Sequence, residues 1–119
     1  MANPIANLLK DFKQKRRLSR ARSLPAMQAR ILHAEAKQVQ AKDELAFEIA
    51  LSYRFEADGQ AAYGSAFSVW FPVENYAKSL AAQVTPEAKL KVRYNPKDPF
   101  ENYALASDNP GVLPFQLAE

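Results

Sequence analysis

The feature that most constrains the fold is a run from Leu45 to Glu56 in which every second residue is large and apolar, and the residues between are alanine or polar. An alternation of period two over this length is typical of a β-strand and leaves little room for a helix. Asp58-Gly59 follows directly, and this dipeptide favours a type I′ hairpin turn. We therefore predict a β-hairpin over residues 45–71 whose returning strand ends at Pro72. One apolar face of this returning strand should carry Tyr63, Ser65, Phe67, Val69 and Phe71.

Two further segments have helical features. Residues 73–84 place an apolar stripe at helical spacing, which predicts the single internal helix. Residues 27–41 contain many alanine, glutamate, lysine and glutamine residues, so propensity alone favours a helix there as well. The alternative for residues 27–41 is a long first strand.

A second strand pattern lies near the C-terminal end. Leu90, Val92 and Tyr94 alternate with basic residues, and the prolines of the sequence Asn95-Pro96-Lys97-Asp98-Pro99 then stop the strand. Proline cannot donate a ladder hydrogen bond, so this segment predicts a turn. A short strand around Tyr103-Ala104-Leu105 should follow.

Residues 90–105 resemble the end of the bacterial domain-of-unknown-function family 3592. That family ends in a Val-x-Val-x-Tyr strand, an Asn/Asp-Pro-x-Asp/Asn-Pro turn and a last short strand. The resemblance covers roughly residues 27–106 and includes the Asp58-Gly59 turn and the internal helix in the same order. It implies that residues 29–34 belong to the first long strand. Many members carry flanking transmembrane helices, whereas this sequence has no apolar stretch long enough to span a bilayer.

The resulting fold class is α+β: a small bent antiparallel sheet, or barrel-like meander, with one packed helix and an N-terminal helical basic arm. A chain of 119 residues accommodates one such domain. We expect an amphipathic, basic arm over residues 1–24, a β-rich domain over residues 25–107 and an irregular tail over residues 108–119. The start of the chain lacks the pattern of a secretory signal, so the expected location is cytoplasmic.

The arm is the strongest candidate for a binding site. Residues 10–22 contain seven basic residues and one acid, whereas the rest of the chain is slightly acidic. The arm has three possible roles. It docks on the domain through Ile5, Leu8, Leu9 and Phe12, it attaches peripherally to the inner membrane surface, or it binds nucleic acid or an acidic protein. The residues expected to contact an anion or partner are Lys13, Lys15, Arg16, Arg17, Arg20 and Arg22.

No residue pattern indicates catalysis. The chain contains no cysteine and a single histidine, His33, so a two-histidine metal site is excluded. No glycine-rich phosphate loop and no nucleophile with a suitably placed base occur. We therefore expect no catalytic, cofactor-binding or metal-binding residue, and no cofactor. The expected function is a non-enzymatic binding or protein-interaction module with an unknown protein partner. Anionic lipid or nucleic acid bound through the arm is the alternative.

Two smaller predictions concern the sheet surface. Lys89, Lys91 and Arg93 should form a basic strip, with Arg54 on a neighbouring strand, and the strip is either a solvated face or an anion-binding surface. Trp70 has two possible placements: it covers the second face of the sheet beneath the N-terminal helix, which is favoured because large apolar side chains are usually buried, or it is exposed as a contact residue.

Overall fold

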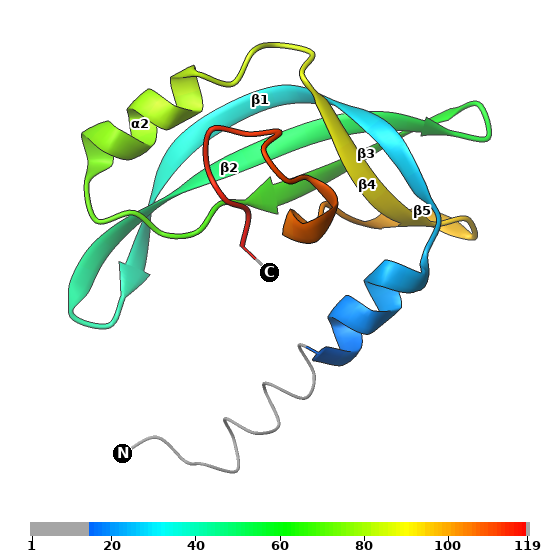
Figure 1. Cartoon of the computed structure of the whole chain (residues 1–119), viewed down its shortest axis with the longest axis horizontal. Coiled ribbons are helices and arrows are strands. Elements are labelled where there is room, and N and C mark those ends of the chain that lie inside the picture. The colour runs from blue at the N-terminus through cyan, green and yellow to red at the C-terminus, as the bar shows by residue number, and fades with distance from the viewer. Residues whose placement is uncertain (1–14, 119) are drawn as a thin grey trace.

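The computed structural model describes residues 15–118 (Figure 1). Residues 15–23 form the N-terminal helix, and the remaining elements follow in chain order. They are β1 (Ala26–Ala41), β2 (Glu44–Ala57), β3 (Gln60–Phe67), α2 (Glu74–Ala82), β4 (Lys89–Asn95), β5 (Asp98–Tyr103) and the short 3-10 helix η1 (Ala106–Asp108). The predicted element order and the α+β fold class are confirmed.

All five strands belong to one antiparallel sheet with the order β3-β2-β1-β4-β5. The sheet curls until the two edge strands approach each other, and Asn102 of β5 donates from Nδ2 to the carbonyl oxygen of Tyr63 in β3. The ladder does not close between them. The sheet therefore has an inner face, which encloses the core, and an outer face, which is turned away from it.

The turn between β2 and β3 agrees with the prediction from the sequence. Asp58 and Gly59 have φ values of 53° and 79°, the two positive angles that a type I′ turn requires. Residues 26–41 form a strand in spite of their helical propensity, because β1 pairs with β2 on one side and with β4 on the other. Tertiary pairing thus outweighs a weak local preference.

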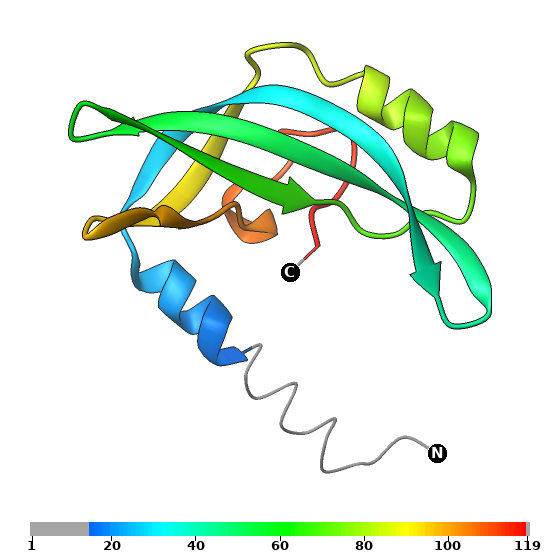
Figure 2. The ribbon, with the colours of Figure 1, turned by 180° about the vertical axis from the view of Figure 1, so that it is seen from behind.

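The core lies on the inner face and is covered by α2 and by the C-terminal segment. Ala77, Leu80 and Ala81 of α2 pack on β1 and β2. Beyond η1, Leu117 is buried against the rest of the core and forms a bridge with Ser68. Viewed from the other side, in Figure 2, β1, β2 and β3 lie in front of this segment. Within residues 15–118, no helix lies over the outer face of these strands.

The apolar face of β3 that carries Tyr63 and Phe67 does not face the core, contrary to the prediction. The buried side chains of β3 are those of Ala62 and Ala66, whereas Tyr63 is 53% exposed and Phe67 is 46% exposed. The reason is the register: Ala57 pairs with Gln60, so each odd-numbered residue of β2 is opposite an even-numbered residue of β3. Because directly opposed residues share a face, the large odd-numbered side chains of β3 point outward.

Two predictions about apolar side chains after β3 are also wrong. Trp70 does not cover the sheet; it is 56% exposed, because β3 ends at Phe67 and residue 70 lies in the connection to α2. The helix is shorter than predicted, and Val73 and Tyr76 from its expected apolar stripe are exposed. The ring of Tyr76 rests edge-on against Phe71, with centroids 5.6 Å apart.

Candidate functional site

The N-terminal helix docks on β5 through two of its cations. Arg20 donates from Nε and from one terminal nitrogen to the two carboxylate oxygens of Glu101, over 2.8 and 3.0 Å. The guanidinium of Arg17 lies 5.6 Å above the ring centre of Tyr103, a cation–π distance. Ala21 of the same helix is buried. Part of the charge of the basic arm is therefore engaged within the protein.

Glu101 is the centre of this junction. Its carboxylate also accepts hydrogen bonds from Asn95 Nδ2 and from the Tyr103 hydroxyl, over 2.9 and 3.1 Å. These donors, led by the Arg20 guanidinium, lower the pKa of Glu101 to about 2. The carboxylate therefore stays ionised and the helix contact keeps its charge pairing at neutral pH.

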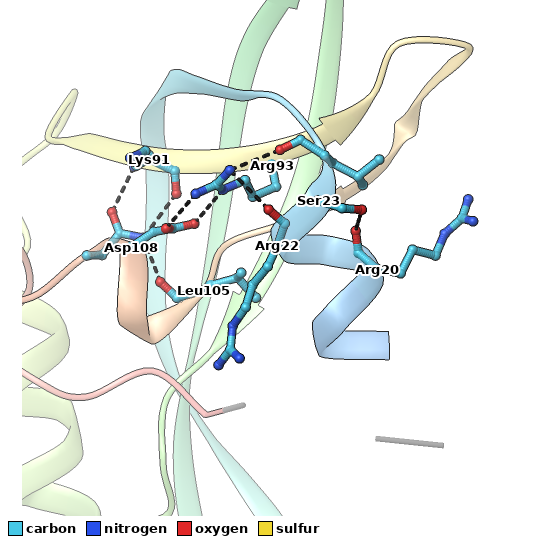
Figure 3. A network of polar contacts seen from close by, with 9 residues as sticks. Arg20, Arg22, Ser23, Lys91, Arg93, Leu105 and Asp108 are labelled. Atoms are coloured by element: carbon cyan, nitrogen blue, oxygen red, sulfur yellow. Dashed lines mark hydrogen bonds and ion pairs between the residues drawn. The ribbon is translucent and has the colours of Figure 1, made fainter. Parts of the chain in front are cut away.

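Arg93 of β4 joins the end of the N-terminal helix to η1 (Figure 3). It makes a two-pronged ion pair with Asp108, over 2.9 and 3.1 Å, and donates to the carbonyl oxygens of Arg22 and Leu24. The last carbonyls of a helix lack partners within the helix, so Arg93 satisfies groups that the helix itself leaves open. Its guanidinium lowers the pKa of the Asp108 carboxyl. Arg93 is thus fully used in the fold and is not part of an open anion site.

The described part of the basic arm does not form one free cluster. Arg17 and Arg20 contact β5, Arg22 lies near Asp108, and Lys15 and Arg16 are exposed at the start of the described helix. Lys13 lies outside the described residues, as do Ile5, Leu8, Leu9 and Phe12. The docking observed for residues 15–23 uses Arg17, Arg20 and Ala21.

A groove of about 330 Å³ separates the N-terminal helix from the edges of β3 and β5. Leu18 and Ala21 line it on the helix side and Ser65 lines it on the β3 side. At one end the groove is limited by Ala118, whose amide donates to the carbonyl oxygen of Phe67. Among the described residues, those that line the groove include the cation Arg17 and no acidic side chain.

The outer face carries a second group of cations, which the fold brings together from three strands. Arg54 of β2 is opposite Arg30 of β1, and Arg30 is opposite Lys89 of β4. On the other side of Arg54 lies Tyr63 of β3. We call these four residues the outer row. The prediction that Arg54 lies on a strand next to β4 is wrong, because β1 is inserted between β2 and β4.

Two conspicuous titratable side chains lie on other parts of the sheet, His33 on β1 and Tyr53 on β2. His33 is exposed, and its Nε2 lies 3.6 Å from a carboxylate oxygen of Glu35. Burial raises the pKa of the Tyr53 hydroxyl well above its ordinary value, so it stays a hydrogen-bond donor and binds Asn102 Oδ1. Among residues 15–118, no group of three or more histidine, cysteine or acidic side chains is placed to hold a metal ion.

Comparison with known families agrees with the pattern of strands and turns. A family model described as "Domain of unknown function (DUF3592)" matches residues 27–108, more than half of the chain. The chain belongs to the DUF3592 family. No curated protein and no solved structure matches it.

The region matched by the DUF3592 model contains the whole outer row and begins after the N-terminal helix. No helix within residues 15–118 has both the length and the apolar character needed to cross a membrane.

Sequence reasoning identified Arg54 and Lys89 in this DUF3592 domain as basic surface residues but missed their alignment with Arg30 and Tyr63. The position of Tyr63 opposite Arg54 could have been predicted from the sequence. A two-residue turn at Asp58-Gly59 pairs odd-numbered with even-numbered residues, and this alone places Tyr63 opposite Arg54. The alignment of Arg30 with Lys89 depends on a pairing between segments far apart in the sequence, for which no local signal exists.

Proposed function

We propose that this DUF3592 domain is a non-enzymatic binding module and that the outer sheet face is its binding surface. The observation that carries the proposal is the exposure of two large aromatic side chains on that face. Tyr63 and Phe67 lie on the same side of β3, with only Ser65 between them. Soluble proteins that expose neighbouring large apolar side chains commonly use them for contacts with a partner.

The composition of the rest of the face supports the same proposal. An antiparallel sheet with one solvated face normally carries polar side chains there. Here aromatic and cationic side chains meet on the outer face, and aromatic and arginine side chains are the groups enriched in binding interfaces. The non-enzymatic part of the proposal is supported by the exposure of His33, which lies beyond hydrogen-bond distance of its charged neighbour Glu35, and by the structural role of Tyr53. A bacterial cytosolic setting, expected from the resemblance and from the absence of cysteine, completes the proposal.

The test is site-specific photo-crosslinking in the host cell with the full chain. A photo-crosslinking amino acid replaces Ser65 on the outer face in one version and Ser79 in the other. Ser79 is an exposed residue of α2 and serves as the matched control position. We expect discrete crosslinked products from position 65 and none from position 79. Tyr63→Ser should reduce them. Equal products from both positions, or none from position 65, would contradict the proposal.

A further inference from the structure

The outer row places three cations directly opposite one another across β2, β1 and β4. Neighbouring strands lie about 4.8 Å apart, so the row from Tyr63 to Lys89 is roughly 14 Å long. Like charges directly opposite each other on adjacent strands destabilise a sheet. Arg54 next to Arg30, and Arg30 next to Lys89, therefore cost stability in the free protein.

The acids near the row compensate these charges only weakly. Arg30 lies 3.7 Å from Glu87 and Arg54 lies 3.6 Å from Glu56, both beyond hydrogen-bond distance. Pairs of this kind at an exposed surface contribute little. Arg20 and Arg93, by contrast, each hold a carboxylate with two short hydrogen bonds. The row therefore consists of cations that the described part of the chain leaves without a tightly held anion.

Arg54 has a further feature that suits an external ligand. Its Nε is buried and has no hydrogen-bond partner among residues 15–118, and the side chain is 32% exposed. Buried donors without partners are uncommon and call for an explanation. A turn of the guanidinium toward an external anion loses no hydrogen bond at Nε and gains charge-assisted ones.

We propose that the outer row binds the phosphate backbone of a single-stranded nucleic acid, with Tyr63 stacking on a base. This rests on the proposed function, because it assigns the partner of the same outer face. Arg30, Arg54 and Lys89 neutralise phosphates, while Tyr63 offers an exposed ring at the end of the row. Cations that follow the backbone and aromatic rings that stack on bases are the two parts of single-strand binding sites. Sheet faces of similar width bind two or three nucleotides.

The distribution of charge on the outer face favours a single strand over a membrane. An anionic membrane is a plane and would meet the whole face at once, including Glu35, Glu48 and Glu56 on β1 and β2. A single strand is narrow and follows the row between these acids. The exposed rings of Tyr63 and Phe67 favour a nucleic acid over an acidic peptide, because bases present a π-face on which an aromatic ring can stack and carboxylates do not.

The test measures binding of the full chain to fluorescein-labelled oligo-uridylate and oligo-thymidylate of about 12 nucleotides, within the usual site size. Fluorescence anisotropy is recorded over a series of salt concentrations. The triple variant Arg30→Gln, Arg54→Gln, Lys89→Gln should reduce the slope of log K against log salt by about 2, since each phosphate contact on a single strand contributes about 0.7. Tyr63→Ser should weaken binding by about tenfold. Circular dichroism checks that each variant is folded.

Matched control variants separate the row from the rest of the protein's charge. Lys97→Gln removes another exposed lysine, from the turn after β4, and it should change affinity far less than Lys89→Gln. The double variant Lys15→Gln, Arg22→Gln tests the N-terminal helix and should leave the salt slope nearly unchanged. If this double variant abolishes binding while the row variants do not, the arm is the site and the proposal is wrong.

Two other probes decide the class of partner. Poly-glutamate and vesicles containing anionic lipid should compete poorly with the oligonucleotide. If either probe competes as strongly as unlabelled oligonucleotide does, the assignment to nucleic acid is wrong. If neither oligonucleotide binds while the position 65 crosslink persists, the outer face is a binding surface for another partner, and only this inference fails.

Discussion

The two faces of β3 differ in a way that reverses the usual relation between size and burial. The inner face carries Ala62, Gly64 and Ala66, all small, whereas the outer face carries the large rings of Tyr63 and Phe67. The space inside is already filled from β2. A Cβ atom on Gly64 would lie 2.5 Å from the ring and hydroxyl of Tyr53. The space left by neighbouring strands, and not the size of a side chain, decided which face of β3 is buried.

The cations show a parallel contrast between the helix junction and the outer face. Arg20 and Arg93 are held by two-pronged pairs that tie separate segments together. Arg30 and Arg54 oppose each other and hold acids only loosely. Arginines of the first kind support the fold, whereas those of the second kind remain available to a ligand.

The largest expected effect comes from adding volume to the inner face of β3. Gly64→Val should lower the free energy of unfolding by about 3 kcal/mol, because a side chain at this position would overlap Tyr53 and Asn102 and force them to shift. Its neighbour on the outer face is the control: Ser65→Val should change stability by no more than about 0.5 kcal/mol. Urea unfolding measures both. Equal effects would show that the two faces are not distinct.

The second prediction compares the two tyrosines that are closest to Gly64. Tyr53→Phe removes the hydroxyl that donates to Asn102 and links β2 to β5, and it should cost about 1 kcal/mol. Tyr63→Phe, on the outer face, should be neutral. Thermal or urea unfolding decides between these outcomes, and a neutral Tyr53→Phe would mean that the buried hydroxyl does not hold the strands together.

The third prediction concerns the repulsion within the outer row. Arg30→Gln should leave stability within about 0.5 kcal/mol of the parent protein and shift it toward greater stability at low salt, because Arg54 and Lys89 lose a like-charged neighbour. Added salt screens the repulsion, so the difference should shrink as salt rises. Unfolding at low and high salt measures it. A clear loss of stability would mean that Arg30 supports the fold and is not kept for a ligand.

The smallest expected effect is local and depends on pH. The pKa of Glu101 is lowered in the folded protein, so its contact with Arg20 contributes above the ordinary pKa of 4.5 and is lost as pH falls toward about 2. An NMR titration of the Arg20 Nε–H signal should show a transition in this window. Glu101→Gln is the control and should lack this transition.

Local patterns predicted most of the fold for identifiable reasons. The period-two run through Phe47, Ile49 and Leu51 specified a strand. The dipeptide Asp58-Gly59, which adopts two positive φ angles, specified the hairpin. The inner face of β3 was predictable from the same two-residue turn, and the error arose from assigning the large side chains to the core. The arm was identified as basic, but its contacts with Glu101 and Tyr103 join residues about 80 positions apart.

The sequence by itself determined the hairpin at Asp58-Gly59, the internal helix and the family resemblance, because each depends on short-range periodicity, turn chemistry or a continuous pattern. Local propensity left residues 27–41 open between helix and strand, and pairing with β2 and β4 decided that they form a strand. Only the tertiary structure decided which cations are paired and which are open. Arg93 and Lys89 are equally basic residues of one strand, yet Arg93 meets Asp108 and Lys89 meets Arg30. The physical reason is the curl and register of the sheet, which bring together side chains that are distant in the sequence.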